Sequence, residues 1–342
     1  MAQSHAIAFF GLEEWEKQYL LSHPALSRHR DAVSFIDDIL DKSRAADFGH
    51  ADIVSVFVDS AIDKAALDAM PALKCIAARS TGYDHIDIAE CKKRGIVVSS
   101  VPTYGEYTVA EYAFALILCL SRNIYQAYDQ IRETGSFSQQ GLRGFDLRGK
   151  TLGVVGCGKI GRHVVAIGRR FEMNVLVHDT QADGKFLKDM GAASASFEEL
   201  LSQSDIVTLH VPYIPATHHL MNGKTIATMK KGAYLINTSR GGIVETEALV
   251  KALKEGHLGG AGLDVLEEEG AIRDELDFLM KGDLKEHNLK TILANHILID
   301  MPNVIITPHN AFNTTEALQR ILDTTAENIA GFLAGNPINV VS

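Results

Sequence analysis

Residues 151–161, TLGVVGCGKIG, constrain this chain more than any other segment. An apolar run rich in β-branched residues leads directly into Gly156, Gly158 and Gly161, and a second apolar run ends in a carboxylate at Asp179. This order predicts a strand, a tight glycine turn, a helix and a second strand, which together bind a dinucleotide. A glycine motif alone is weak evidence, but here the strand, the helix and the acidic residue stand at the expected spacing.

Each of the three glycines has its own expected role. Gly156 allows the tight turn, Gly158 lets the backbone approach a pyrophosphate, and Gly161 lets the helix pack closely on the strand. The phosphates are expected on the free N–H groups of the helix N-terminus. Asp179 is expected to accept hydrogen bonds from the adenosine ribose and to repel the 2′-phosphate of NADP, so the predicted cofactor is NAD.

The overall composition predicts a cytoplasmic protein of two domains. A chain of 342 residues can form two full cores. Its net charge of −10 opposes binding to nucleic acid or to an anionic membrane, because there is no excess of Lys and Arg. No apolar run is long enough to span a bilayer, no signal peptide is expected, and the 4 scattered cysteines are typical of a reducing compartment.

Short apolar runs alternate with helical patterns along the chain, which predicts parallel sheets wound by helices. The first hundred residues contain four predicted strands, at 6–10, 51–58, 74–79 and 95–100. A helix over 105–122 and a glycine-rich extended connection over 134–150 follow. The second series contains six predicted strands, at 152–156, 174–179, 205–211, 233–239, 260–265 and 303–308.

Two later segments are predicted to be helical. Residues 267–302, where Asp, Glu and Lys are dense among leucines, indicate an inserted helical structure. A further helix is predicted over 314–335. If that helix returns to the first domain, the first domain is discontinuous in sequence.

Polar residues with useful chemistry follow three strands of the second series. Arg240 follows the strand at 233–239, glutamates occupy 267–269 after the strand at 260–265, and His309 follows the last strand. Ligands of doubly wound sheets bind outside the carboxyl ends of the strands. An arginine, an acid and a histidine are therefore expected at the edge that holds the cofactor. The remaining histidines, including the adjacent His218 and His219, fit no metal pattern, and no metal is expected.

Several motifs resemble those of a known family. INTSRGGIVETEAL, GAGLDVLEEE and TPHNAF resemble the D-2-hydroxyacid dehydrogenases, and VPTYGEYTVAEYAFALIL and LHVPYIPATHHLMN are most similar to the D-lactate dehydrogenase branch. The resemblance implies an NAD-binding Rossmann domain, residues 104–311, inserted into a flavodoxin-like substrate domain, residues 1–103 and 312–342. It also implies a homodimer, formed through the helix at 105–122 and the glycine-rich arm after it.

The resemblance implies three catalytic residues. Arg240 aligns with the substrate-binding arginine, whose guanidinium fits a carboxylate bidentately and polarises the adjacent keto oxygen. His309 aligns with the acid–base histidine, which exchanges a proton with the substrate oxygen. Glu269, five residues after Asp264, has the spacing of the acid that pairs with this histidine. The two glutamates before it remain competitors for that role.

The resemblance also implies residues around the substrate and the cofactor. Thr81 and Gly82 match the loop whose N–H groups meet the substrate carboxylate, and Tyr104 and Phe312 match aromatic residues of the lactate-branch pocket. The cofactor contacts implied are Lys159 and Ile160 at the pyrophosphate, Val211, Pro212 and Thr217 near the adenosine, and Thr238, Ser239 and Asp264 near the nicotinamide. Ordinary packing remains the alternative for each of these positions.

The expected activity is therefore reversible, NAD-dependent reduction of a 2-keto acid to a D-2-hydroxy acid. NADH would supply the hydride, His309 the proton, and Arg240 the anchor for the carboxylate. Pyruvate is the favoured substrate because Tyr104 and Phe312 match the lactate branch. Dehydrogenases of hydroxyisocaproate, glycerate, phosphoglycerate and phosphite remain alternatives, as does an NAD-sensing co-repressor without enzymatic activity. The sequence leaves open the physiological substrate, the direction of the reaction in the cell and any allosteric control.

Overall fold

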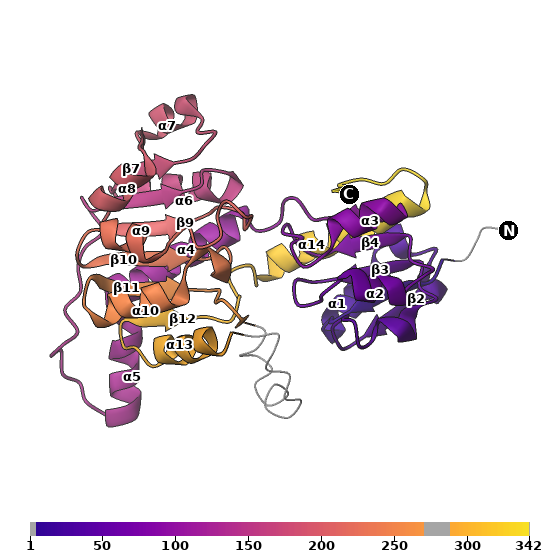
Figure 1. Ribbon diagram of the computed structural model, residues 1–342, viewed down its shortest axis with the longest axis horizontal. Coiled ribbons are helices and arrows are strands. Elements are labelled where there is room, and N and C mark those ends of the chain that lie inside the picture. Colours follow the sequence, from indigo (N-terminus) through magenta and orange to yellow (C-terminus); the bar gives the residue numbers. More distant parts are fainter. Residues whose placement is uncertain (1–4, 270–287, 342) are drawn as a thin grey trace. The chain divides into compact units, whose positions relative to one another are not determined.

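The computed structural model describes residues 5–269 and 288–341, which divide into two units (Figure 1). The first unit is Met1–Tyr104 with Asn313–Ser342, and the second is Gly105–Phe312. Both boundaries lie one residue later than the sequence predicted. Within the first unit, the Arg320 guanidinium donates to the Tyr104 carbonyl oxygen at 2.8 Å.

The first unit is built on a parallel sheet of five strands. The strands are β1 (Ile7–Phe10), β2 (Val33–Ile36), β3 (Ile53–Val56), β4 (Cys75–Ala78) and β5 (Val97–Ser99). Their spatial order, β2-β1-β3-β4-β5, is that of flavodoxin-like sheets. The expected fold of this unit is therefore confirmed.

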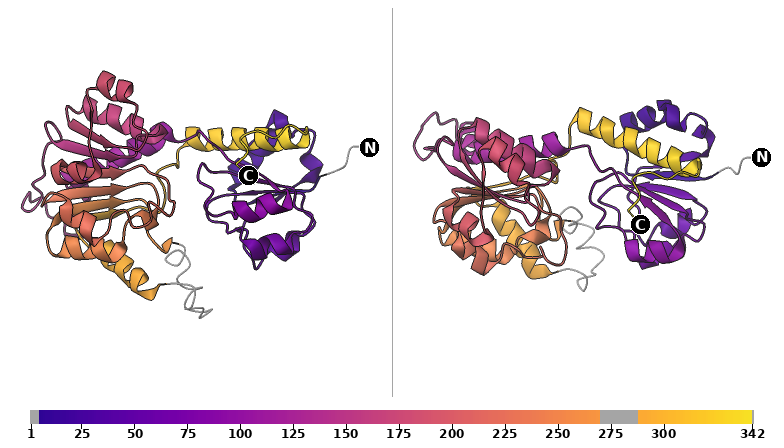
Figure 2. Two further views of the ribbon diagram at one scale, coloured as in Figure 1. Left: turned by 45° about the horizontal axis from the view of Figure 1, so that its top comes forward. Right: turned by 90° about the horizontal axis from the view of Figure 1, so that it is seen from above.

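Helices cover both faces of this sheet (Figure 2). They are α1 (Glu14–Ser22), α2 (Lys64–Ala69), α3 (Ile88–Arg94) and the C-terminal α14 (Thr315–Leu333). Side chains alternate along β1, because successive residues of a strand point to opposite faces. Ala8 and Phe10 share a core with α2 and α3, whereas Ile7 and Phe9 pack with α1 and α14. The last helix thus completes the core that the first strand begins.

The second unit is built on a parallel sheet of seven strands. The strands are β6 (Thr151–Val155), β7 (Asn174–His178), β8 (Ala193–Ser194), β9 (Ile206–Leu209), β10 (Ala233–Asn237), β11 (Leu258–Leu263) and β12 (Val304–Ile306). Their order is β12-β11-β10-β9-β6-β7-β8. This is the Rossmann order with one more strand beside β11. Successive strands are added in one direction from β6 to β8 and in the other direction from β9 onward. Such sheets bind dinucleotides at this point of reversal, between β6 and β9.

Helices also enclose the second sheet from both sides. They are α4 (Glu106–Ser121), α5 (Ile124–Thr134), α6 (Lys159–Arg170), α7 (Gly184–Met190), α8 (Phe197–Gln203), α9 (Gly223–Thr228), α10 (Thr246–Lys254) and α13 (Leu289–Ile299). Leu152 and Val154 of β6 share a core with α4 and α6, while Val155 packs with α8, α9 and α10. Apolar residues on both faces explain why the strands appear in the sequence as continuous apolar runs.

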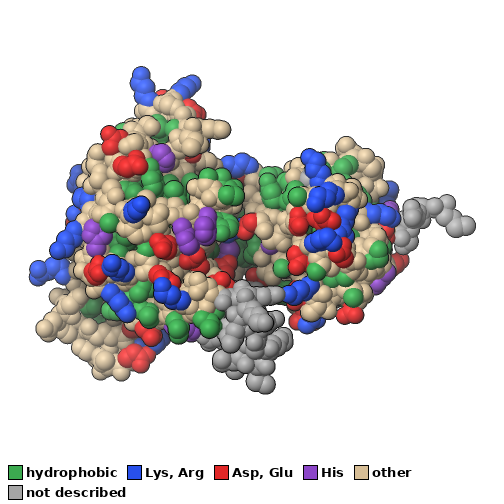
Figure 3. Space-filling model, in the orientation of Figure 1, with side chains coloured by type: hydrophobic (Ala, Val, Ile, Leu, Met, Phe, Trp, Pro, Cys, Tyr) green, Lys and Arg blue, Asp and Glu red, His purple; other side chains and the backbone are tan. Residues whose placement is uncertain are grey.

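The structure adds elements that the sequence pattern did not predict. β2 is only half-buried, and both residues of β8 are exposed. The helical insertion predicted over 267–302 lies partly outside the described residues, and its described part contains α13. None of the described helices is long and apolar enough to cross a membrane. On the face that Figure 3 shows, acidic and basic side chains are interspersed.

Candidate active site

The turn between β6 and α6 brings the three glycines of the motif to the point where the winding reverses. Gly156 has a φ of +91°, and a Cβ there would lie 2.5 Å from the His210 carbonyl oxygen. A Cβ on Gly161 would lie 2.0 Å from the Gly156 carbonyl oxygen. A Cβ on Gly158 would meet no atom of the described residues within 4 Å. Packing therefore requires glycine at two positions, and open space lies above the third.

The first turn of α6, at Lys159 and Ile160, faces this open space with backbone donors. The first N–H groups of an α-helix have no carbonyl partner within the helix. In the described structure no side chain caps this helix, whose N-cap is Gly158. The helix dipole adds a partial positive charge at this end. The turn therefore has the donors and the charge that a pyrophosphate needs.

Asp179 lies beside the glycine turn at the end of β7. Its Oδ2 accepts a hydrogen bond from the Cys157 N–H at 2.6 Å, and its Oδ1 accepts one from the Gln181 N–H at 2.6 Å. An ionised carboxylate has further lone pairs, so these bonds leave room for ribose hydroxyl donors. Asp179 thus joins the end of β7 to the glycine turn and presents a negative charge there.

Two buried polar atoms near the ends of β9 and β10 lack partners among the described residues. They are Oγ1 of Thr238 and Nδ1 of His210. Burial lowers the pKa of His210 to about 3, so its imidazole is neutral at physiological pH. The neighbouring Ser239 hydroxyl is occupied, because it donates to the Leu209 carbonyl at 2.7 Å. An orphaned hydroxyl at Thr238 fits a cofactor that supplies the missing partner.

The loop after β9 contains the residues expected near the adenosine. Thr217 Oγ1 donates to the Pro212 carbonyl at 2.6 Å and accepts from the Ile214 N–H at 2.9 Å. The Thr217 hydroxyl therefore stabilises the loop to which it belongs. A methyl group of Val211 lies 2.9 Å from the position of a Cβ on Gly156, so this loop also packs against the glycine turn.

His309 and Glu269 form a pair at the carboxyl edge of the sheet. His309 Nδ1 lies 2.9 Å from Glu269 Oε1, with the side chains 25% and 46% exposed. His309 Nε2 has no hydrogen-bond partner in the described part of the chain. Glu267 has other partners, because its Oε1 lies 2.7 Å from His219 Nε2 and its Oε2 accepts from Thr246. The geometry therefore distinguishes Glu269 from this competitor.

Asp264 organises the loop that carries His309. Its Oδ1 accepts from the Thr307 hydroxyl at 2.5 Å and the Asn310 N–H at 2.8 Å, and its Oδ2 accepts from the Ala311 N–H at 2.8 Å. The His309 N–H donates to its carbonyl oxygen at 2.8 Å. Burial raises the pKa of Asp264, and these hydrogen bonds oppose the shift. The carboxylate thereby holds a loop in which His309 has a φ of +51°.

This anchoring role of Asp264 is absent from the sequence analysis, which placed the residue near the nicotinamide. A signal for it was present, since an acid at the end of the apolar strand GAGLDV is unusual. The carboxylate is 1% exposed and engages three donors, so its main described contacts are with the histidine loop.

Arg240 begins the loop after β10 and is half-buried. Its Nη1 donates to the Ser239 carbonyl at 2.9 Å. The next residue, Gly241, packs so closely that a Cβ there would lie 2.0 Å from the Leu266 carbonyl carbon. The loop of Arg240 therefore contacts the loop after β11, which in turn carries the glutamate of the glutamate–histidine pair. The loops that follow the neighbouring strands β10, β11 and β12 therefore lie side by side.

The first unit contains the turn expected to meet a substrate carboxylate. Thr81 Oγ1 donates to the Val101 carbonyl at 2.7 Å, and Ser80 Oγ donates to the Gly82 carbonyl at 2.6 Å. The backbone N–H groups of Thr81 and Gly82 have no acceptor among residues 5–269 and 288–341. Consecutive free N–H groups in a turn form a concavity suited to an anion.

The two aromatic candidates lie in different units. Tyr104 is the last residue of the first unit before the chain enters the second, and Phe312 is the last residue of the second. Both are half-buried. Each unit thus carries one of them next to a point where the chain passes between units.

The adjacent His218 and His219 lie in a turn with their rings stacked, 3.9 Å between centroids. His218 Nδ1 lies 3.0 Å from the Tyr213 hydroxyl, and His219 pairs with Glu267. Both therefore have structural partners. Within the described ranges, no group of three or more His, Cys, Asp or Glu side chains is placed to hold a metal ion.

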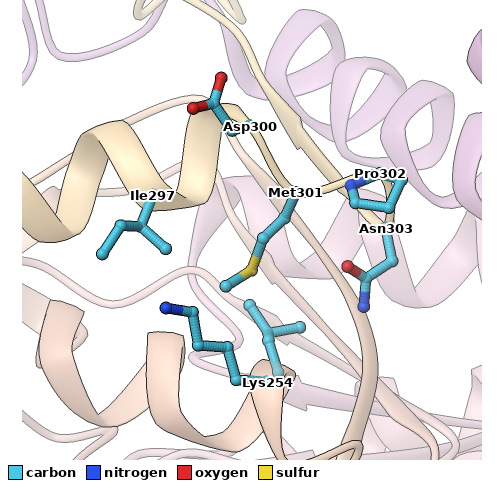
Figure 4. A pocket seen from close by; sticks show the side chains of 7 residues that line it. Lys254, Ile297, Asp300, Met301, Pro302 and Asn303 are labelled. Carbon is cyan, nitrogen blue, oxygen red and sulfur yellow. The ribbon is translucent and has the colours of Figure 1, made fainter.

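A pocket between α10 and α13 lies at the opposite edge of the second sheet (Figure 4). Lys254 precedes β11 and Asn303 precedes β12, so their side chains line the pocket at the amino ends of these strands. Ligands of doubly wound sheets bind at the carboxyl ends. This pocket is therefore separate from the residues described above.

This chain is similar to known proteins over most of its length. Residues 114–311 match the family model described as D-isomer specific 2-hydroxyacid dehydrogenase, NAD binding domain. The 2-hydroxyacid dehydrogenase homolog 1 of Schizosaccharomyces pombe is 38% identical over 96% of this chain and 97% of its own length. A glyoxylate reductase of Thermococcus litoralis is 37% identical over 85% of this chain and 83% of its own. The structure of D-lactate dehydrogenase from Aquifex aeolicus, complexed with NAD and lactic acid, has 34% identity and a TM-score of 0.86 over 98% of this chain and 100% of that one.

Proposed function

Because this chain belongs to the D-isomer specific 2-hydroxyacid dehydrogenase family and has its NAD-binding domain, we propose that it reduces pyruvate to D-lactate, reversibly. The observation that carries the proposal is the 2.9 Å contact between His309 and Glu269 at the carboxyl edge of the NAD-binding sheet. The D-lactate dehydrogenase of Aquifex aeolicus, with a TM-score of 0.86, supports lactate as the product.

His309 is the proposed acid–base group. In reduction its Nε2 gives a proton to the ketone oxygen, and in oxidation the same atom takes the proton back. Bound NADH supplies the hydride to the carbonyl carbon. Glu269 holds the ring through Nδ1. Asp264 keeps the loop in place by accepting hydrogen bonds on both sides of His309.

Arg240 is the proposed anchor of the substrate carboxylate. A guanidinium can bind a carboxylate through two parallel hydrogen bonds, which fixes the orientation of the keto group. The free N–H groups of Thr81 and Gly82 offer further donors to the same carboxylate. Tyr104 and Phe312 are the proposed pocket residues beside the methyl group of pyruvate.

The residues around the glycine turn fit NAD. Gly158 leaves space for the pyrophosphate at the N-terminus of α6, with Lys159 and Ile160 contributing backbone N–H groups. The orphaned Thr238 hydroxyl supplies a polar contact on the nicotinamide side. Asp179 presents a carboxylate to the adenosine ribose, and its charge opposes the 2′-phosphate of NADP. We therefore expect a higher kcat/KM with NADH than with NADPH.

Glyoxylate is the second candidate substrate. The glyoxylate reductase of Thermococcus litoralis is 37% identical to this chain, so overall identity does not separate the two substrates. Glyoxylate lacks the methyl group of pyruvate, and one such group changes discrimination by only about 1–3 kcal/mol.

The deciding experiment is a panel of 2-keto acids with side chains of increasing size, assayed by the loss of NADH. We expect kcat/KM to be highest for pyruvate and to fall for glyoxylate and for branched side chains. A preference for glyoxylate of tenfold or more would reassign the substrate within the family. No turnover of any 2-keto acid would refute the proposed reaction.

We also propose that the protein is a cytoplasmic homodimer. Most residues of α4 are buried within the second unit, but α5 and the arm after it carry exposed apolar side chains. Tyr125, Tyr128 and Ile131 of α5 are 52%, 60% and 48% exposed, and Phe137 is 90% exposed. A second copy of this surface would cover them. Sedimentation of the wild type and of Tyr128→Asp tests this, with a dimer expected only for the wild type.

A further inference from the structure

Arg79 in the first unit is a buried cation without a bonded anion. The residue is 2% exposed and follows β4. Its Nη1 donates to the Ser55 carbonyl at 3.0 Å and to the Ser55 hydroxyl at 3.2 Å. Its Nη2 donates to the carbonyl oxygens of Phe10 at 2.5 Å and Gly11 at 3.3 Å. All of these acceptors are neutral.

Two carboxylates attract Arg79 through space. They are Glu16 and Asp59, whereas each described hydrogen bond of the guanidinium ends on a neutral oxygen. The Glu16 carboxylate accepts a bond from the Glu13 N–H instead. Burial lowers the pKa of Arg79 to about 10, so the group remains charged at neutral pH.

The guanidinium occupies a special position in the sheet. Its partners lie at the end of β1 and in β3, and the winding of this sheet reverses between these two strands. Flavodoxin-like sheets bind ligands at this point, outside the carboxyl ends of the strands. In this chain the side chain of Arg79 fills that position and places a fixed positive charge there.

Such a charge is expensive to bury, and hydrogen bonds to carbonyl groups satisfy its donors without neutralising it. A neutral side chain would fill the same volume at lower cost. The turn with the free Thr81 and Gly82 N–H groups follows immediately. Because Thr81 is two residues later, its Cα lies within about 7 Å of the Arg79 Cα. The backbone of the buried cation and the free donors therefore lie close together after β4.

We propose that Arg79 is a positioning residue for substrate binding: its buried charge, behind the Thr81–Gly82 turn, strengthens the hold of that turn on the substrate carboxylate. The inference rests on the proposed function and adds a residue that does not touch the substrate. At an effective dielectric constant of about 20, a unit charge within about 10 Å changes the affinity for an anion roughly tenfold.

Two substitutions separate the charge of Arg79 from its hydrogen bonds. Arg79→Gln removes the charge and keeps a polar group, whereas Arg79→Lys keeps the charge and loses most of the bonds to Ser55 and Phe10. The readouts are KM and kcat for pyruvate, the dissociation constant of oxamate with NADH bound, the dissociation constant of NADH, and Tm. Oxamate is a pyruvate analogue with the same carboxylate.

For Arg79→Gln we expect KM for pyruvate and the dissociation constant of oxamate to rise about tenfold. Its kcat and its affinity for NADH should stay within a few-fold of the wild type. For Arg79→Lys we expect a lower Tm but an affinity for oxamate within about threefold of the wild type, because the charge remains. If Arg79→Gln does not fold, Arg79→Met replaces it, and Arg79→Lys tests the role of the charge by itself.

Two results would overturn the inference. One is an unchanged affinity for oxamate in the folded neutral variant. The other is an equal loss in Arg79→Lys, which would assign the effect to the hydrogen bonds. A wild-type protein that neither binds oxamate nor reduces a 2-keto acid would instead refute the proposed function, so the two failures are distinguishable.

Discussion

The contact between Glu269 and His309 predicts that catalysis depends on the Glu269 carboxylate. Glu269→Gln keeps the size of the side chain and an oxygen that accepts from Nδ1, but it removes the negative charge. Two unit charges about 4 Å apart interact by about 4 kcal/mol at an effective dielectric constant of 20 and by about 1 kcal/mol in water. Because Glu269 is 46% exposed, solvent screens the pair. We therefore take the interaction energy between the two side chains as about 1–2 kcal/mol.

The direction of the effect follows from the role of the ring. Glu269 holds the imidazole of His309 through Nδ1, and the amide in Glu269→Gln would hold it without a charge. At about 1.4 kcal/mol for each factor of ten in rate, a loss of about 1–2 kcal/mol lowers kcat/KM for pyruvate by about 5- to 30-fold. Oxidation of D-lactate uses the same histidine, so its kcat/KM should fall by a similar factor.

The assay measures kcat/KM in both directions for the wild type, Glu269→Gln and Glu268→Gln. The second variant is a matched control, because it removes the same charge from the adjacent residue, whereas Glu269 makes the 2.9 Å contact with His309 Nδ1. An unchanged kcat/KM in Glu269→Gln would refute the reasoning. An equal loss in the control would show that net charge, rather than this contact, sets the rate.

Three further substitutions test other parts of the structure. Arg240→Lys keeps the charge but loses the two parallel N–H donors of the guanidinium, so KM for pyruvate should rise by about 10- to 100-fold. An unchanged KM would contradict the anchor role. Gly161→Ala places a methyl group 2.0 Å from a backbone oxygen, so NADH binding should be lost in a fluorescence titration. Burial raises the pKa of Asp205, but hydrogen bonds from Lys230 and from the Thr151 N–H outweigh it and the pKa is lowered. The ionised Asp205 carboxylate therefore stabilises the fold at pH values above its unfolded-state pKa of about 3.9. This stabilisation is lost as the pH falls through the lower folded-state pKa. Urea unfolding of Asp205→Asn should show a loss of about 1–3 kcal/mol at pH 7 that disappears in strong acid, and an equal loss at both pH values would contradict the assignment.

The sequence predicted the elements whose signal is local. The apolar runs of β6 and β9 are buried on both faces, and the glycine motif stands between a strand and a helix at the spacing of a dinucleotide-binding turn. β2 and β8 were missed: β2 is a half-buried run of four residues, VSFI, and β8 has only two residues, both exposed.

The partners of individual side chains were harder to predict, because tertiary contacts decide them. Glu267 and Glu269 are identical residues two positions apart, yet one pairs with His219 and the other with His309. Spacing alone favoured the second, and only the fold explains the difference. In the sequence, Arg79 likewise stands where an ordinary charged residue would follow a strand. Its burial results from the packing of β1 and β3 around it.

The most direct test of the account is to identify the product formed by the purified protein from pyruvate and NADH. Loss of NADH and the amounts of each lactate enantiomer, separated by chiral chromatography, are measured in the same sample. We predict that one molecule of D-lactate forms for each NADH consumed. Formation of L-lactate, or no loss of NADH with pyruvate or any other 2-keto acid, would contradict it.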